Sequence, residues 1–253
     1  MKPLENKIII STRPLSDEDT IKSSLIGKGA IVLDFPMIQI VINDQNTEIQ
    51  TTLANISSYD WLLFTSKNGV DSFFRLLKND MQKTTAGLPK IAVIGKTTAN
   101  EVTKNGCQAD FISSGNTSED FIAELKSEIK SNDKILLALG ELADTKFEDG
   151  FADTASVTRL NVYKTIETDV HPVEIIQRIK ANEYDLLVFT SPSGFRNFVK
   201  VMYQNNCKDP FKIACIGTTT EKEVLKLGYA PLIVSPKSSG DFFSVEIENY
   251  FSK

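Results

Sequence analysis

Apolar residues along the chain follow two patterns: short unbroken runs, and longer stretches in which they recur every three or four positions. The run LLF at 62–64 stops at Thr-Ser and leads into NGVDSFFRLL, whose apolar positions at helical spacing are Val70, Phe73, Phe74 and Leu77. Short strands that are apolar throughout and alternate with amphipathic helices are typical of parallel sheets buried on both faces. The pattern therefore predicts an α/β protein.

The same strand-to-helix corner occurs twice in the chain. The stretch DWLLFTSKNGVDSFF from Asp60 returns as DLLVFTSPSGFRNFV from Asp185. Likewise, IAVIGKTTANEVTKNG from Ile91 returns as IACIGTTTEKEVLKLG from Ile213. Both pairs are separated by roughly 120–125 residues, and such a nearly constant offset indicates two copies of one structural unit.

Two segments with an alternating pattern stand apart from these repeats. One is PMIQIVI, which begins at Pro36, and the other is SVTRLNVYKT at 156–165. In the second segment Leu160 and Val162 lie on one face of the expected strand, and the opposite face carries Arg159, Asn161, Tyr163 and Thr165. The two segments could pair as a ladder that links two domains.

The start of the chain leaves two threadings open. Residues 7–12 and 30–35 read as strands around a helix at about 16–28, and KIIISTRP from Lys7 loosely matches KILLALGE from Lys134. In one threading, residues 1–35 plus 171–253 form a discontinuous lobe, 42–155 form an inserted lobe, and 36–41 and 156–170 are linker strands. In the other, two domains follow one another with a cut near residue 130. The repeats alone favour neither.

Composition limits the classes of function. The chain has 253 residues, a net charge of −5 and no basic block, so nucleic acid is not an expected partner. A single histidine, His171, excludes a multi-histidine metal site. Cys107, Cys207 and Cys215 are scattered, no signal-like segment opens the chain, and no apolar run is long enough to span a membrane. We expect a soluble cytoplasmic protein that binds no membrane.

Four corners rich in small polar residues follow the repeated strands. They begin at Thr65, Gly95, Thr190 and Gly217. Backbone N–H groups at a helix start, together with Ser and Thr hydroxyls, can bind an anion without net positive charge. Ligands in parallel α/β sheets bind at this carboxyl end of the strands. The four corners together favour a site for a polycarboxylate.

The competing interpretation of the corners is helix capping. Ser and Thr are common N-caps, Pro192 suits a first helical position, and two corners carry the capping-box pattern, Thr98-x-x-Glu101 and Thr218-x-x-Glu221. Neither a GxxxxGK[ST] loop nor a GxGxxG helix start is present, which disfavours a nucleotide enzyme.

The duplicated Phe-Thr-Ser-x-x-Gly and Ile-Gly-x-Thr-Thr motifs, with Val-Tyr-Lys-Thr between the copies, resemble those of the uroporphyrinogen-III synthase family. The resemblance runs from Arg13 to Phe242, essentially the whole chain, and rests on the order and spacing of the motifs. It implies two three-layer α/β lobes with parallel sheets, the second inserted into the first and joined to it by a two-stranded β-ladder. It thus selects the inserted threading.

The resemblance also implies a reaction. The family cyclises the linear hydroxymethylbilane to uroporphyrinogen III, with loss of water and inversion of the terminal pyrrole ring, and uses no metal and no cofactor. The expected catalytic residue is Tyr163, at the tyrosine of the Val-Tyr-x-Thr motif, because a tyrosine with an ordinary pKa near 10 is protonated at neutral pH and can donate a proton. The expected substrate-binding residues are Arg13, Ser66, Thr98, Ser191, Ser193, Thr219 and Thr220. We expect a monomer.

The alternative function is a two-lobed binding protein that closes on a polycarboxylate small molecule without catalysis. The two functions share a fold and differ only in turnover. Without the resemblance, Tyr163 is a half-buried strand residue, Arg13 a surface residue, and the corner hydroxyls helix caps.

Overall fold

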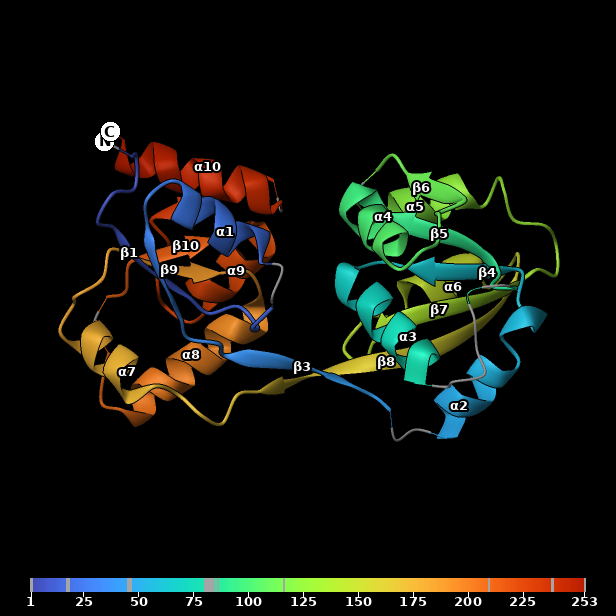
Figure 1. The fold of residues 1–253 in the computed structure, drawn as a ribbon, viewed down its shortest axis with the longest axis horizontal. Helices are drawn as coiled ribbons and strands as arrows, with labels where there is room; N and C mark the ends of the chain where they lie inside the picture. Colours follow the sequence, from blue (N-terminus) through green and yellow to red (C-terminus); the bar gives the residue numbers. More distant parts are fainter. Residues whose placement is uncertain are drawn as a thin grey trace. The chain divides into compact units, whose positions relative to one another are not determined.

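The computed structural model describes residues 2–16, 19–44, 47–79, 85, 87–115, 117–208, 210–237 and 239–252. The chain divides into two compact units, shown in Figure 1. The outer unit consists of Met1–Gln39 and Ile166–Lys253, and the inserted unit of Ile40–Thr165. The predicted α/β class with parallel sheets is confirmed.

The outer unit contains one five-stranded sheet in the order β11-β10-β9-β1-β2, and all its described strand pairs are parallel. Its strands are β1 (Ile8–Ser11), β2 (Ile31–Asp34), β9 (Leu186–Phe189), β10 (Ile213–Cys215) and β11 (Ile233–Val234). Its helices are α1 (Thr20–Gly27), α7 (Val173–Lys180), α8 (Pro192–Gln204), α9 (Thr218–Lys226) and α10 (Gly240–Phe251). β1 pairs with β9 in the register Ile9↔Leu186, as the inserted threading requires.

The helices of the outer unit cover both faces of its sheet. Successive strand residues point to opposite faces, so Ile9 packs in the cluster of α1 and α10, and Ile10 packs in the cluster of α7, α8 and α9. Strands buried on both faces must be apolar throughout, which explains the unbroken runs in the sequence.

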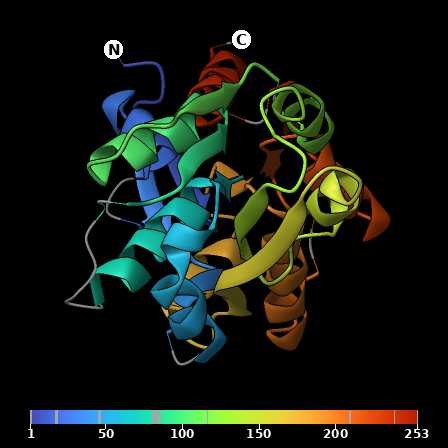
Figure 2. The same ribbon diagram turned by 90° about the vertical axis from the view of Figure 1, so that its right-hand side faces the viewer.

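The inserted unit repeats this arrangement around a six-stranded sheet in the order β3-β8-β7-β4-β5-β6. Its strands are β3 (Ile38–Ile42), β4 (Trp61–Phe64), β5 (Lys90–Ile94), β6 (Phe111–Ser113), β7 (Lys134–Gly140) and β8 (Ser156–Glu167). Its helices are α2 (Thr47–Ala54), α3 (Lys67–Asn79), α4 (Gly95–Lys104), α5 (Ser118–Leu125) and α6 (Lys146–Phe151), with a short 3₁₀ turn at Ile56–Ser58. In Figure 2, α3 (teal) and α6 (yellow-green) lie on opposite sides of β8 (yellow).

β3 and β8 are neighbours in this sheet, and the chain passes between the units inside both of them. The backbone N–H of Thr168 donates to the carbonyl of Met37 at 3.3 Å, and that of Asn43 donates to Val162 at 3.1 Å. Partner numbers that rise on one strand as they fall on the other define an antiparallel pair. The alternating segments noted in the sequence thus form a two-stranded ladder.

The duplication extends to the aromatic cores. Phe64 at the end of β4 contacts Phe73 and Phe74 of α3, and Phe189 at the end of β9 contacts Phe195 and Phe198 of α8. All these rings are fully buried. Burial of each such ring stabilises the fold by roughly 1.5–3 kcal/mol, so each corner is anchored by its own core and its first polar residues stay at the sheet edge.

Candidate functional site

The carboxyl end of the outer sheet gathers most of the residues predicted for that unit. From the central pair β1 and β9, the chain runs through α1 to β2 on one side and through α8 to β10 on the other. Such a switch of direction opens a crevice at the carboxyl ends of the central strands. Arg13 follows β1, Ser191 and Ser193 follow β9, and Thr219 and Thr220 follow β10, all on neighbouring strands.

At the β9–α8 corner, Ser191 is the N-cap of α8. Its Oγ accepts a hydrogen bond from the N–H of Gly194 at 3.1 Å and lies 3.3 Å from the Oγ of Ser193. Pro192 occupies the first turn, as expected for a residue without an N–H group. The capping interpretation is therefore confirmed here, and Ser193 keeps a half-buried hydroxyl at the corner.

The β10–α9 corner differs from the capping-box prediction, which is wrong. The N-cap is Gly217, which is buried and has no side chain, and Thr218 is already inside the helix. Thr218 and Thr219 are exposed, whereas Thr220 is 2% exposed. Among the described residues no side chain caps α9, so the N–H groups of its first turn lack a side-chain acceptor there, and the exposed hydroxyl of Thr219 lies beside them.

Arg13 is held at the end of β1 by an ion pair. Its Nε lies 3.0 Å from the Oδ2 of Asp19, the N-cap of α1, whose Oδ1 accepts from the N–H groups of Ile21 and Lys22. Asp19 is buried and Arg13 is about a quarter exposed, at 27%. The guanidinium is thus oriented by α1, with a part of its surface open to solvent.

In the inserted unit, the β4–α3 corner matches that of β9 and α8. The Oγ of Ser66 accepts from the N–H of Gly69 at 3.2 Å, so Ser66 takes the capping position of Ser191. Gly69 approaches the backbone of β7 closely, because a Cβ built on it would lie 2.9 Å from the carbonyl oxygen of Ala138. Lys67, which the sequence analysis did not single out, lies 3.5 Å from the carboxylate of Glu101.

The second capping box, at the β5–α4 corner, is also wrong. The helix begins at Gly95, whose φ of 72° turns the chain directly from β5 into α4, and the N-cap is Ile94 without a side-chain cap. Thr98 therefore lies inside the helix and is 4% exposed. Its predicted role at the site stays a prediction, and its burial favours a packing role.

Tyr163 lies at the carboxyl end of β7, within the inserted unit. Its backbone pairs with Gly140 across an irregularity in the β7–β8 register, and its carbonyl accepts from the N–H of Glu141 at 3.0 Å. The ring rests on Gly140: a Cβ there would lie 2.6 Å from Cζ and 2.8 Å from the hydroxyl oxygen. Tyr163 is half-buried, and its hydroxyl makes no hydrogen bond within the part of the chain that the structure describes.

Neither Gly140 nor the role of Arg159 was predicted from the sequence. The guanidinium of Arg159 donates to carbonyl oxygens of the loop that follows β7. The sequence predicted that Arg159, Asn161 and Tyr163 share one face of β8, but the register irregularity at Gly140 interrupts the alternation, and Tyr163 packs against the cluster of Leu160 and Val162. The partners of Arg159 could not be predicted, because every residue carries the backbone carbonyl group that it binds.

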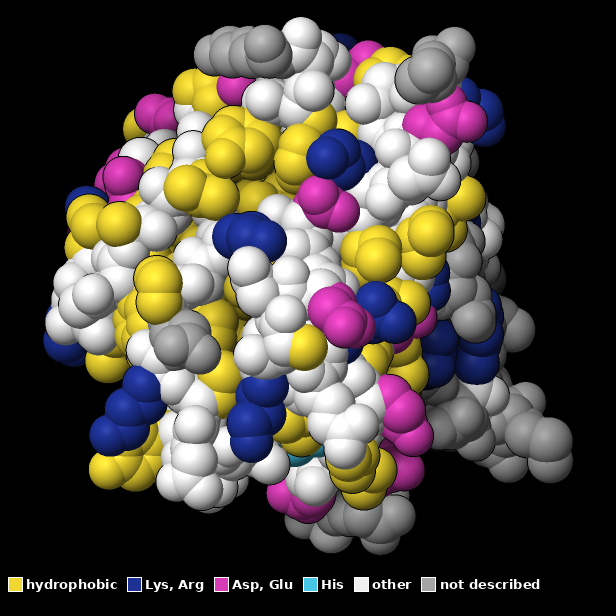
Figure 3. All heavy atoms as spheres, turned by 90° about the vertical axis from the view of Figure 1, so that its left-hand side faces the viewer, with side chains coloured by type: hydrophobic (Ala, Val, Ile, Leu, Met, Phe, Trp, Pro, Cys, Tyr) yellow, Lys and Arg dark blue, Asp and Glu magenta, His cyan; other side chains and the backbone are white. Residues whose placement is uncertain are grey.

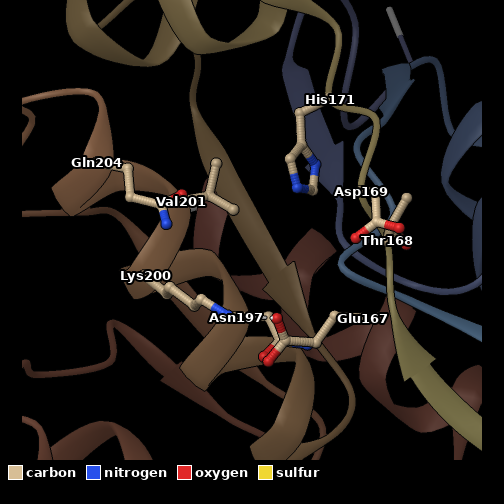
Figure 4. Close-up of a pocket in the computed structure, with 8 residues that line it drawn as sticks. All are labelled: Glu167, Thr168, Asp169, His171, Asn197, Lys200, Val201 and Gln204. Atoms are coloured by element: carbon tan, nitrogen blue, oxygen red, sulfur yellow. Dashed lines mark hydrogen bonds and ion pairs between the residues drawn. The ribbon is translucent and has the colours of Figure 1, made fainter.

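The outer unit also holds a small polar cavity of about 170 Å³, next to the end of β8 (Figure 4). Lys200 pairs with Glu167 at 2.6 Å across it, and Asn197 donates to the carbonyl of Met37. Nδ1 of His171 and Oγ1 of Thr168 are buried there without a hydrogen bond of good geometry among the described residues. The other lining residues are Asp169, Val201 and Gln204.

Burial changes the acid–base behaviour of two groups in the outer unit. It lowers the pKa of His171, and the nearby carboxylate of Asp169 and the carbonyl of Thr168 oppose this effect. It raises the pKa of the Cys215 thiol to about 12, with a smaller contribution from the negative charge of Glu221. Cys215 is therefore an inert core thiol, and His171 is neutral at pH 7.

The described residues hold neither a metal-binding cluster nor a membrane-spanning helix. No group of three or more His, Cys, Asp or Glu side chains is placed to hold a metal ion in this part of the chain. None of its helices is both long and apolar enough to cross a membrane. On the face of the outer unit in Figure 3, basic and acidic side chains are interspersed with apolar ones, without a continuous basic area.

The chain matches the family described as "Uroporphyrinogen-III synthase HemD" over residues 19–241. A protein of Methanocaldococcus jannaschii is 29% identical over 231 residues, covering 89% of this chain and 91% of that one. The uroporphyrinogen-III synthase of Chlorobaculum parvum is 24% identical over 249 residues, covering 95% and 98%. The solved structure of uroporphyrinogen-III synthetase from Helicobacter pylori has a TM-score of 0.63 at 15% identity, covering 95% of this chain and 97% of that one, a likeness of fold alone.

Proposed function

The chain belongs to the uroporphyrinogen-III synthase family, and we propose that Tyr163 assists departure of the substrate hydroxyl while the corners of the two sheets bind the substrate carboxylates. A member of this family is a lyase that closes hydroxymethylbilane to uroporphyrinogen III with inversion of the terminal ring. The observation that carries the proposal is the Tyr163 ring on Gly140, with a hydroxyl that no described residue binds.

The chemistry needs little more than a weak acid and a controlled geometry. The electron-rich pyrrole that carries the hydroxymethyl group expels its own hydroxyl, and a proton from Tyr163 would let that group leave as water. The tyrosinate would then recover a proton from the ring carbon after closure. Left alone, the bilane closes without inversion, so the protein's main task is to hold the chain where closure through a spiro intermediate is faster.

The carboxylates of the bilane would bind at helix N-termini. The first turn of α9 has no side-chain cap, and a carboxylate there would accept from its backbone N–H groups and from Thr219. Ser193 and the partly exposed guanidinium of Arg13 lie at neighbouring strand ends of the same unit. Ser66 would serve the matching corner of the inserted unit. Thr98 and Thr220 are buried, so their contribution would be to shape the corners.

We also propose that the protein is a cytoplasmic monomer. Its lobe boundaries would lie at 35 and 171 for the outer lobe and at 42 and 155 for the inserted lobe. Size-exclusion chromatography with light scattering tests the first point. Limited proteolysis tests the second, with early cleavage expected at 168–172, which lies between β8 and α7 and has no regular structure.

The direct test supplies freshly prepared hydroxymethylbilane and separates the type I and type III products after oxidation. We expect type III uroporphyrinogen in excess over the spontaneous type I product. A protein that binds the bilane and yields only type I would instead be the non-catalytic binder, and the proposed function would be wrong.

A further inference from the structure

The peptide that joins Gly140 to Glu141 is tied at both ends by residues of β8. Its carbonyl accepts from Nη2 of Arg159 at 3.1 Å, and its N–H donates to the carbonyl of Tyr163 at 3.0 Å. Since a peptide unit is planar, two such anchors fix both the tilt and the position of the plane. The Cα that begins this peptide is the one on which the Tyr163 ring rests.

Arg159 also holds the rest of the loop after β7. Nη2 donates to the carbonyl of Ala143 at 2.8 Å, and Nη1 donates to the carbonyl of Asp144 at 3.1 Å. A planar guanidinium presents five N–H donors in a fixed fork, whereas a lysine ammonium has three on a flexible stem, so arginine is better suited to bind several fixed carbonyl oxygens at once. One guanidinium therefore binds several carbonyl groups of the loop, and β8 positions Arg159 itself.

Side chains in turn orient the guanidinium. Its Nε donates to Oδ1 of Asn161 at 2.8 Å, and its Nη1 lies 2.9 Å from the carboxylate of Glu148 on α6. Arg159 and Tyr163 lie on either side of the irregularity in the β7–β8 register, and the Tyr163 ring packs against the cluster of Leu160 and Val162. The arginine and the tyrosine thus meet the same glycine from the same strand.

We propose that Arg159 and Gly140 are positioning residues for Tyr163: Arg159 fixes the peptide of Gly140, and Gly140 fixes the ring. This inference rests on the proposed role of Tyr163 in the reaction. A Cβ at position 140 would lie closer to the ring than side chains tolerate, so a larger residue must turn the ring away. A purely structural role would instead let these residues stabilise the loop without any effect on the tyrosine.

The test is a double-mutant cycle of Gly140→Ala and Tyr163→Phe, with kcat and KM measured for formation of type III product. We expect Gly140→Ala to lower kcat about 10- to 100-fold with KM changed by less than about threefold, because the ring is displaced and the substrate corners are intact. In the Tyr163→Phe background the same change should have an effect of less than about twofold. Additive losses would overturn the proposal.

A matched control is Gly150→Ala in α6, which crowds only the side chain of Ile122, 2.7 Å from the added Cβ. It should lower the melting temperature about as much as Gly140→Ala and leave kcat unchanged. Arg159→Lys keeps the charge and loses the fork, so it should lower kcat in the wild-type background and have no further effect beside Tyr163→Phe. If Arg159→Lys fails to fold, Gly140→Ala alone decides.

The outcomes separate this inference from the proposed function. If Tyr163→Phe slows the reaction and Gly140→Ala does not, the proposed role of Tyr163 stands and the positioning role is wrong. If Tyr163→Phe has wild-type turnover, both are wrong, whatever Gly140→Ala does. A wild-type protein that makes no type III product overturns the family activity itself.

Discussion

The ends of β1 and β7 occupy the same place in the two copies of the repeat and carry different residues. KIIISTRP places Arg13 after β1, and KILLALGE places Gly140 at the end of β7. Arg13 pairs with Asp19, the N-cap of the following helix in its own unit. Gly140 instead receives the ring of Tyr163. One position thus holds a charged side chain in one unit and a surface for a neighbouring ring in the other.

The neighbouring strand explains the difference. In the outer unit, β2 ends at Asp34, level with Ser11 of β1. In the inserted unit, β8 passes Ala138 at Leu160 and continues to Glu167. Only a strand that continues past the end of its partner can place a side chain over that end. The two units share one arrangement of strands and helices. They differ at this strand end because β8, which continues into the other unit, extends past the end of β7.

The largest expected effect is that of a substitution at Tyr163, the residue whose ring makes the end of β7 differ from the end of β1. Tyr163→Phe should lower turnover about 10- to 100-fold, since general acid assistance contributes roughly 10²–10⁴-fold when fully used and this leaving group departs readily. The melting temperature should not change, because the ring still rests on Gly140. Type III formation and thermal unfolding measure the two quantities.

A suitable control is Tyr229→Phe, at a ring that stacks on Phe211 in the outer core. It should leave turnover at the wild-type level. Wild-type turnover of Tyr163→Phe itself would make Tyr163 a packing residue, and the two strand ends would then differ in structure only.

The next effect compares two equivalent glycines. Gly69→Ala should destabilise the protein by about 1–3 kcal/mol, because the added methyl meets the carbonyl oxygen of Ala138, which belongs to the β7 backbone and cannot move aside. Gly194→Ala should be nearly neutral: its nearest neighbours are the hydroxyls of Ser191 at 3.1 Å and Thr12 at 4.0 Å, and alanine favours the helix. Urea unfolding of both variants tests this, and equal destabilisation would show that the two corners pack alike.

A smaller effect is expected at the corner where α9 begins. Thr219→Ala should weaken substrate binding by about 1.5 kcal/mol, roughly tenfold in KM, the lower end of a charge-assisted hydrogen bond because Thr219 is exposed. The melting temperature should hardly change, since Gly217 and not a threonine is the N-cap. Thr219→Ser should restore most of the binding. Full activity of the alanine variant at limiting substrate would make this corner a helix start and nothing more.

The smallest effect concerns the outer end of the linker strand. Burial lowers the pKa of His171, which faces Asp169 and Glu167 of its own segment and Lys200 of α8. Because the folded-state pKa lies below the unfolded value of about 6.5, the unfolded chain binds more protons in acid. Stability should be complete above about pH 6.5 and decrease as the pH falls through the folded pKa.

The measurement is the urea midpoint at several pH values between 7.5 and 5, for the wild type and for His171→Gln, which cannot titrate there. The wild type should lose more stability on acidification than the variant. Equal pH dependence of the two proteins would show that His171 is as well solvated in the fold as in the unfolded chain.

The class of fold, the duplication and the position of most elements could be predicted from local patterns in the sequence. Apolar runs and helical spacing are local consequences of burial, so the strands at 61–64 and 186–189 and the helices after them could be predicted. Alternation also placed Leu160 and Val162 on the buried face of β8. The Ser-Pro corner predicted its own cap, because the cap, the proline and the N–H group lie within four residues.

The starts of α4 and α9 and the contacts of Tyr163 depend on how strands and helices pack, and they could not be predicted from local patterns. The two capping boxes were wrong because the chain turns at Gly95 and Gly217 directly from a buried strand into a helix, before the threonines are reached. The contacts of Gly140 with Arg159 and with Tyr163 join strands that α6 separates in the chain. They depend on backbone carbonyl groups, which every residue has, and on the absence of a side chain at Gly140. Neither feature indicates a contact until it is known which strands are paired.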